Sequence, residues 1–158
     1  MGDQIPFPLP PEKAAAAPAR LTALEKAEFL RNVDIFSQLN VEELFRLASI
    51  AQEVQFPAGE IIFREDDIVD ALFVVVRGKV ELVSKEYGFQ SLAGPREAFG
   101  IYSMLAREPN YLAAQALEDT WALSIAAEDF YNLLSHNMEI VVSIFKHFAR
   151  KLRLSPRF

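Results

Sequence analysis

The chain has 158 residues, of which 51% are hydrophobic and 11% aromatic, and its formal net charge is −6. This length and composition are typical of one globular domain with a sizeable core, and they exclude a disordered chain. The acidic balance argues against a large nucleic-acid interface, and the absence of cysteine excludes disulfides and thiol catalysis.

The N-terminal segment differs in composition from the rest of the chain. Five of the nine prolines fall within residues 1–18, and proline fixes φ and donates no N–H. We therefore predict a flexible tail over residues 1–20, a single domain over 21–154 and a C-terminal end over 155–158. The start of the chain lacks the pattern of a signal peptide, and no apolar run reaches the roughly 20 residues of a membrane span. We expect a cytoplasmic chain that does not contact a membrane.

Two helices are predicted at the start of the domain. The first runs from about Leu21 to Arg31. The second follows Asn40, which together with Glu43 three residues later has the pattern of a capping box. The apolar residues of this second helix are spaced as one helix face and comprise Val41, Leu44, Phe45 and Ala48.

Short β-type runs separated by turn residues fill the segment from Glu53 to Ile125. Leu72–Val76 is a continuous apolar run, as expected for a strand that is buried on both faces. Gly59 and Gly78 lie between such runs, where a positive φ is expected. Roughly eight strands with this spacing predict a jelly-roll-type β-roll, and the flanking helices make the fold α+β.

Two helices are predicted to close the domain, one over Glu128–Ser135 and a longer one that begins near Met138. Apolar residues recur along the longer helix at spacings of three and four: Met138, Val141, Phe145, Phe148 and Leu152. One interpretation of this stripe is that it covers the domain's own β-roll.

The sequence gives little support to an enzyme. The only histidines, His136 and His147, lie in the C-terminal helical region, whereas a cupin-like metal site needs two or three histidines with a carboxylate. We expect His147 on a solvated or capping face of its helix. No histidine has a plausible spacing from Ser84, Ser91 or Ser103 to act as a base. We therefore predict no catalytic residues and no metal.

The most specific motif spans Phe99 to Ala116. It reads Phe-Gly-Ile-Tyr-Ser-Met-Leu, then four residues, then Pro-Asn-Tyr-Leu-Ala-Ala-Gln-Ala. This motif resembles the phosphate-binding cassette of the cyclic-nucleotide-binding domain family, whose pattern is Phe-Gly-Glu-x-Ala-Leu followed after a spacer by Pro-Arg-x-Ala-Thr. The segments 58–65, 70–75 and 78–80 resemble the family's early strands in the same order. The resemblance implies two helices, a small β-roll and two further helices.

The resemblance also implies a set of pocket residues. In the family the cassette Glu binds the ribose and the Arg binds the phosphate, and this chain has Ile101 and Asn110 at those positions. A short helix over Ile101–Leu105 would present free N–H groups to an anion, and Ser103 would offer a further donor. Arg96 and Arg107 are candidate substitute cations. The candidate pocket comprises Phe99, Gly100, Ile101, Tyr102, Ser103, Asn110, Tyr111 and Leu112.

These residues lead to two functional hypotheses. The first is a non-enzymatic regulatory or protein-interaction module that does not bind cyclic AMP or cyclic GMP tightly, and whose pocket is empty or takes an apolar or aromatic guest. The alternative is a sensor that binds a cyclic nucleotide through a non-standard pocket. The resemblance further implies that the last helix pairs across a homodimer, contacts a protein partner or caps the ligand. No helix-turn-helix follows in this sequence, so we do not expect the chain to bind DNA.

Overall fold

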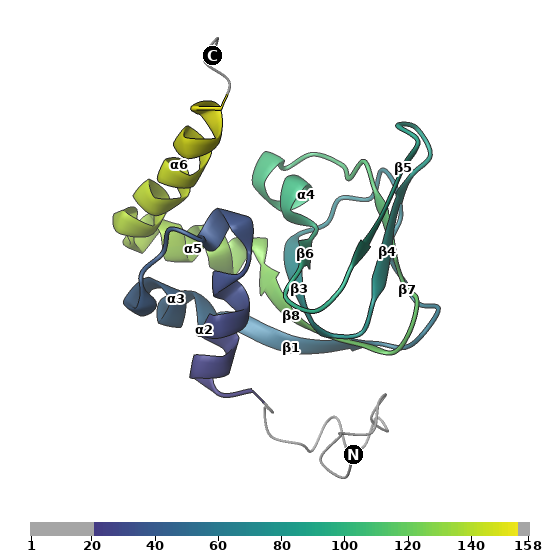
Figure 1. Ribbon diagram of the computed structural model, residues 1–158, viewed down its shortest axis with the longest axis horizontal. Helices are drawn as coiled ribbons and strands as arrows, with labels where there is room; N and C mark the ends of the chain where they lie inside the picture. Colours follow the sequence, from purple (N-terminus) through teal and green to yellow (C-terminus); the bar gives the residue numbers. More distant parts are fainter. Residues whose placement is uncertain (1–20, 155–158) are drawn as a thin grey trace.

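The computed structural model describes residues 21–154, and the predicted tail (1–20) and C-terminal end (155–158) lie outside the described residues. A group of helices lies beside a β-roll, and one short helix, α4, lies at the edge of the roll nearest to them (Figure 1). The helices are α2 (Ala23–Arg31), η1 (Asp34–Phe36), α3 (Val41–Ala48), α4 (Ile101–Ala106), α5 (Ala127–His136) and α6 (Met138–Leu152). The predicted α+β class is confirmed.

The eight predicted strands are also confirmed, and they form two antiparallel four-stranded sheets. The strands are β1 (Ala51–Phe56), β2 (Ile61–Phe63), β3 (Ala71–Arg77), β4 (Val80–Ser84), β5 (Phe89–Ala93), β6 (Ala98–Phe99), β7 (Ala113–Ala116) and β8 (Thr120–Ala126). The sheet orders are β1-β8-β3-β6 and β2-β7-β4-β5. The cassette lies between β6 and β7 in the chain and therefore passes from one sheet to the other.

Strand β3 separates two hydrophobic cores. Leu72 and Val74 belong to the core that the sheet shares with the helices, where the rings of Phe36 and Phe130 lie 6.0 Å apart. Val75 belongs to the core inside the roll. Because alternate side chains of a strand point to opposite faces, this run is buried on both faces, as predicted.

The predicted capping box at the start of α3 is confirmed. The side-chain Oδ1 of Asn40 accepts from the Glu43 N–H at 2.8 Å, and the Glu43 carboxylate accepts from the Asn40 N–H at 2.9 Å. The predicted apolar face is partly wrong, because Val41 and Phe45 are exposed. The buried arc of α3 is formed by Glu43, Leu44, Leu47 and Ala48, so it is rotated away from the face that the apolar spacing selects.

Helix α6 packs on η1 and α5 rather than over the strands, so the expectation that it covers the β-roll is wrong (Figure 1). Its buried residues include Ile140 and Ile144, whereas Phe145 is 66% exposed. His147 is only 8% exposed, and its Nδ1 lies 3.5 Å from the Ser37 hydroxyl. Of the two predicted alternatives, a solvated or a capping face, the solvated face is therefore wrong, because the imidazole is buried beside Ser37, the C-cap residue of η1. None of the described helices is long and apolar enough to cross a membrane.

Candidate ligand-binding cassette

The cassette begins at a glycine that no other residue could replace without strain. Gly100 has φ +85°, and a Cβ added there would lie 2.9 Å from the carbonyl oxygen of Ala71. The preceding Phe99 is buried, and its ring stacks on Phe73 with 5.1 Å between the centroids. The left-handed backbone and the anchored ring together set the direction in which α4 leaves the sheet.

Ser103 holds α4 to the loops on either side of it. Its buried hydroxyl donates to the carbonyl oxygen of Glu108 at 2.7 Å and accepts from the Val69 N–H at 3.2 Å. A serine hydroxyl has one hydrogen to donate, and here that hydrogen is already used. In this structure Ser103 therefore fixes the cassette rather than presenting a spare donor to a ligand.

Asn110 occupies the position where the resemblance places the family's arginine. Its backbone is fixed, because its N–H donates to the Asp67 carbonyl at 2.9 Å and its carbonyl accepts from the Asp66 N–H at 2.8 Å. The residue is 2% exposed, and its side-chain Nδ2 has no hydrogen-bond partner. A buried amide donor without a partner carries a desolvation penalty of about 1–3 kcal/mol. Asn110 thus provides an unused donor inside the cassette.

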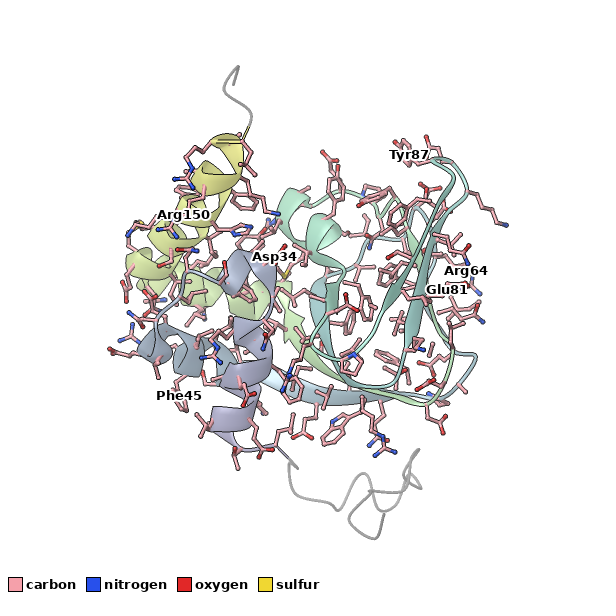
Figure 2. The ribbon with its side chains drawn as sticks, in the orientation of Figure 1. Asp34, Phe45, Arg64, Glu81, Tyr87 and Arg150 are labelled. Atoms are coloured by element: carbon pink, nitrogen blue, oxygen red, sulfur yellow. The ribbon has the colours of Figure 1, made fainter. Side chains whose placement is uncertain are left out.

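Three tyrosines link the cassette to the β4–β5 hairpin. The rings of Tyr102 and Tyr111 meet edge to face at 5.3 Å, and Tyr111 meets Tyr87 at 6.1 Å. Tyr87 lies at the tip of the hairpin (Figure 2). The Tyr102 hydroxyl donates to the Glu108 carboxylate at 2.5 Å, and this hydrogen bond raises the pKa of Tyr102 above its ordinary value. Sequence reasoning did not select Tyr87 or Glu108, because only the folded hairpin and spacer bring them to the cassette.

The two apolar residues of the cassette contact different cores. Ile101 packs against the core shared with the helices, and Leu112 packs against the core inside the roll. The cassette is therefore attached to both halves of the domain. At the family's ribose-binding position, Ile101 supplies apolar surface and no hydrogen-bond acceptor.

The candidate substitute cations both contact helices. Arg96 lies 3.2 Å from the Glu28 carboxylate, and its guanidinium carbon is 5.7 Å from the centre of the Phe29 ring on α2. The guanidinium carbon of Arg107 lies 4.5 Å from the centre of the Tyr131 ring on α5. Both arginines have a positive φ, 71° for Arg96 and 56° for Arg107. Each guanidinium therefore has a partner on a helix, and neither partner belongs to the cassette.

Two acidic residues hold the backbone of the buried Asn110 through their own backbone, Asp66 with its N–H and Asp67 with its carbonyl. Asp66 has a φ of 71°, in the left-handed region. Aspartate tolerates this left-handed geometry, as expected from its short polar side chain. Among residues 21–154, no group of three or more histidine, aspartate or glutamate side chains could hold a metal ion.

The fold and the cassette together define the architecture of a cyclic nucleotide-binding domain. The sequence profile of that family, described as "Cyclic nucleotide-binding domain", matches residues 53–137. The chain belongs to this family. It is 32% identical over 128 residues to the cyclic AMP receptor protein of Thermus thermophilus, covering 78% of this chain and 59% of that protein.

Other similar proteins have different overall organisation. A cyclic nucleotide-gated potassium channel of Rhizobium etli is 26% identical over 129 residues, covering 78% of this chain and 36% of the channel. The crystal structure of the N-terminal domain of a transcriptional regulator from Streptomyces coelicolor has a TM-score of 0.72 and 28% identity, covering 82% of this chain and 93% of that one. The chain spans about three fifths of the curated relative from Thermus and less of the channel. By name these three relatives are a receptor protein, a channel and a transcriptional regulator, and none of the three is named as an enzyme.

Proposed function

We propose that this chain is a regulatory domain without enzymatic chemistry whose cassette does not hold cyclic AMP or cyclic GMP tightly. One observation carries the proposal. The residue at the phosphate-binding position is Asn110, which is neutral, 2% exposed and fixed through its backbone. A charged hydrogen bond contributes about 1.5–3 kcal/mol, against about 0.5–1.5 for a neutral one, so an amide is a weaker clamp than a guanidinium.

The contacts described for Asn110 also offer no cation to a bound phosphate. Its backbone partners are the N–H of Asp66 and the carbonyl of Asp67, and the candidate arginines lie against rings of α2 and α5. An anion in this position therefore lacks the ion pair that the family's arginine supplies. Ile101 lowers the affinity for a nucleotide further, because a ribose hydroxyl that faces an apolar side chain has no hydrogen-bond acceptor.

A sensor that binds a cyclic nucleotide through a non-standard pocket is the second candidate. The unpartnered Nδ2 of Asn110 favours it, since a phosphate or carbonyl oxygen would satisfy that buried donor. Micromolar affinity would require a cation as well. The available arginines, Arg96 and Arg107, would first have to leave the Phe29 and Tyr131 rings. This cost makes weak binding the expected behaviour of the native chain.

Thermal unfolding with and without cyclic AMP separates the two candidates. Ligand at about 1000 times Kd stabilises a protein by about 4.1 kcal/mol, whereas ligand at about its Kd contributes about 0.4 kcal/mol. At about 1 mM cyclic AMP, a micromolar site would raise Tm by about 8–16 °C and a millimolar site by about 1–2 °C. We expect the smaller shift. A shift of the larger size with either cyclic nucleotide would favour the sensor.

We also propose that α6 is the surface through which the domain associates with a second copy of itself. Its apolar residues Met138 and Phe145 are 68% and 66% exposed, and an apolar groove of about 350 Å³ runs between α4, α5 and α6. Phe130 and Leu134 line the groove from α5. Two identical helices can bury such faces against each other about a two-fold axis.

Sedimentation equilibrium of Phe145→Ser tests this association. We expect the native chain to dimerise and the variant to dissociate at concentrations at least about tenfold higher, because each copy loses a buried aromatic ring. Phe89→Ser is the matched control, since Phe89 is an exposed phenylalanine on β5. A native chain that stays monomeric would contradict the second copy as occupant and favour a different protein partner.

A further inference from the structure

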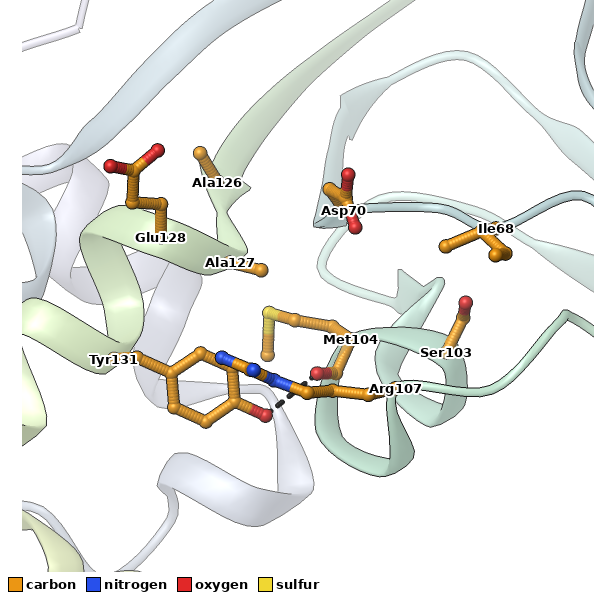
Figure 3. A pocket seen from close by; sticks show the side chains of 9 residues that line it. All are labelled: Ile68, Asp70, Ser103, Met104, Arg107, Ala126, Ala127, Glu128 and Tyr131. Carbon is orange, nitrogen blue, oxygen red and sulfur yellow. Dashed lines mark hydrogen bonds between the residues drawn. The ribbon is translucent and has the colours of Figure 1, made fainter.

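A second cavity lies between the cassette helix α4 and the start of α5 (Figure 3). Its volume is about 480 Å³, which is within the usual range of small-molecule sites. Met104 and Arg107 line it from the cassette helix and its C-cap, Ala127 and Tyr131 from α5, and Asp70 from the residue before β3. Ser103, which belongs to the predicted pocket, also lines the cavity, and Arg107 was predicted as a substitute cation.

The contacts of Arg107 leave its guanidinium able to bind an anion. Its guanidinium carbon lies 4.5 Å from the centre of the Tyr131 ring. That ring is itself fixed, because the Tyr131 hydroxyl donates to the carbonyl oxygens of Met104 and Leu105 at 2.8 and 3.2 Å. Within residues 21–154, no carboxylate forms an ion pair with Arg107. A guanidinium on an aromatic face keeps its N–H edge available for a carboxylate or a phosphate.

Negative charge lines the other side of the same cavity. Asp70 and Glu128 both line it and are exposed. In Figure 3 Asp70 lies above Arg107 in the view, whereas the carboxylate of Glu128 points away from both. Apolar side chains, Met104 and Ala127 among them, also line the cavity. A purely anionic guest would meet Asp70, and a purely cationic one would meet Arg107.

We propose that this cavity binds a small zwitterion, with its anionic group on Arg107, its ammonium group on Asp70, and a short apolar body against the apolar lining of the cavity. The site lies beyond the function proposed for the cassette and needs neither a phosphate nor a nucleobase. Met104 lies in α4 and Arg107 is the C-cap residue of that helix, whereas Tyr131 belongs to α5. A zwitterion bound between them would therefore also hold α4 against α5.

Amide chemical shifts of the full chain, titrated with charged probes at low ionic strength, test the proposal. The probes are 4-aminobutanoate and 6-aminohexanoate, which are zwitterions of two lengths, with hexanoate and hexylammonium as single-charge comparisons. We expect at least one zwitterion to saturate at about 10 mM or below, with shifts confined to residues 68–71, 103–107 and 126–131. The single-charge probes should bind at least about tenfold more weakly. No saturating shift with either zwitterion, or equal binding of the single-charge probes, would overturn the proposal.

Two variants test which residues contact the two charged groups of the zwitterion. Arg107→Gln and Asp70→Asn should each weaken the zwitterion at least about tenfold, because each removes one of the two charged contacts. Arg96→Gln is the matched control, since Arg96 also has a positive φ and contacts an aromatic ring, Phe29, but lines a different part of the surface. Circular dichroism verifies that each variant is folded. Unchanged affinity in both folded variants would overturn the assignment of the charges, and it would do so whatever the cassette binds.

Discussion

Ile101→Glu combined with Asn110→Arg is expected to tighten the binding of cyclic AMP by about 10- to 1000-fold. The two substitutions supply the ribose acceptor and the phosphate clamp that the family's cassette has at these positions. A charged hydrogen bond contributes about 1.5–3 kcal/mol, a buried ion pair loses about 3–5 kcal/mol when one partner is removed, and each ~1.4 kcal/mol is tenfold in Kd. Isothermal titration of the double variant beside the native chain measures the gain.

The single variants and a neutral control show which substitution provides the gain in affinity. Asn110→Arg should provide most of the gain, and Asn110→Gln, which adds length without charge, should provide little. Asn110 is 2% exposed, so the longer side chains can lower Tm, and thermal unfolding without ligand measures that loss separately. If the folded double variant binds no better than the native chain, then the shape of the cassette rather than its missing charges limits binding.

Gly78→Ala is expected to be the most destabilising small substitution in the β-roll. Gly78 has φ +111°, and an added Cβ would lie 2.5 Å from Oγ1 of Thr120 and 2.7 Å from the carbonyl oxygen of Asp119. The strained backbone costs roughly 1–3 kcal/mol and the crowding about 1–3 kcal/mol more, because the backbone carbonyl cannot move away like a flexible side chain. Denaturant unfolding monitored by circular dichroism measures the loss.

Gly59→Ala is the matched control for this prediction. Gly59 also has a positive φ, +88°, yet a Cβ added there would meet nothing within 4 Å. Its replacement should therefore lose only the strain, roughly 1–3 kcal/mol, and the difference between the variants isolates the crowding at Gly78. Equal losses in the two variants would show that the contact with Thr120 and Asp119 relaxes freely.

The sequence predicts the order of elements well because local rules and tertiary packing agree there. The capping box at Asn40 forms with both of its hydrogen bonds, and Gly59 and Gly78 have the positive φ that their turns require. Val80 and Leu82 are buried at alternate positions of β4, as the period of two along a strand requires. The capping box depends on two residues three positions apart, and at the turns and in β4 the local rules agree with the packing around them.

The errors arise where a surface is chosen by distant parts of the chain. The apolar spacing of α6 identifies an apolar face, but it does not say whether strands, helices or solvent lie against it. In the structure η1 and α5 cover Ile140, Ile144 and His147, and Phe145 stays exposed. The prediction for Val41 on α3 is wrong for the same reason, because periodicity alone does not show which arc of a helix the neighbouring elements bury.

In the candidate site, too, the sequence predicts the local features but not the contacts with distant parts of the chain. The motif from Phe99 to Leu112 locates the cassette, and its glycine and short helix are where the sequence places them. The partners of its side chains depend on residues elsewhere in the chain. Ser103 bonds to the Val69 N–H, and Arg107 stacks on Tyr131 of α5. No local sequence pattern predicts such contacts, so the cavity beside Arg107 could be found only in the folded chain.

The most direct test of the central claim is isothermal titration of the native chain with cyclic AMP and cyclic GMP, carried to millimolar ligand at moderate salt. We predict a Kd of about 1 mM or weaker for both, since a neutral Asn110 and an apolar Ile101 replace the two polar anchors. A Kd in the micromolar range or tighter for either ligand would contradict it. That result would also direct attention to Arg96 and Arg107 as cations that leave their ring partners when the nucleotide binds.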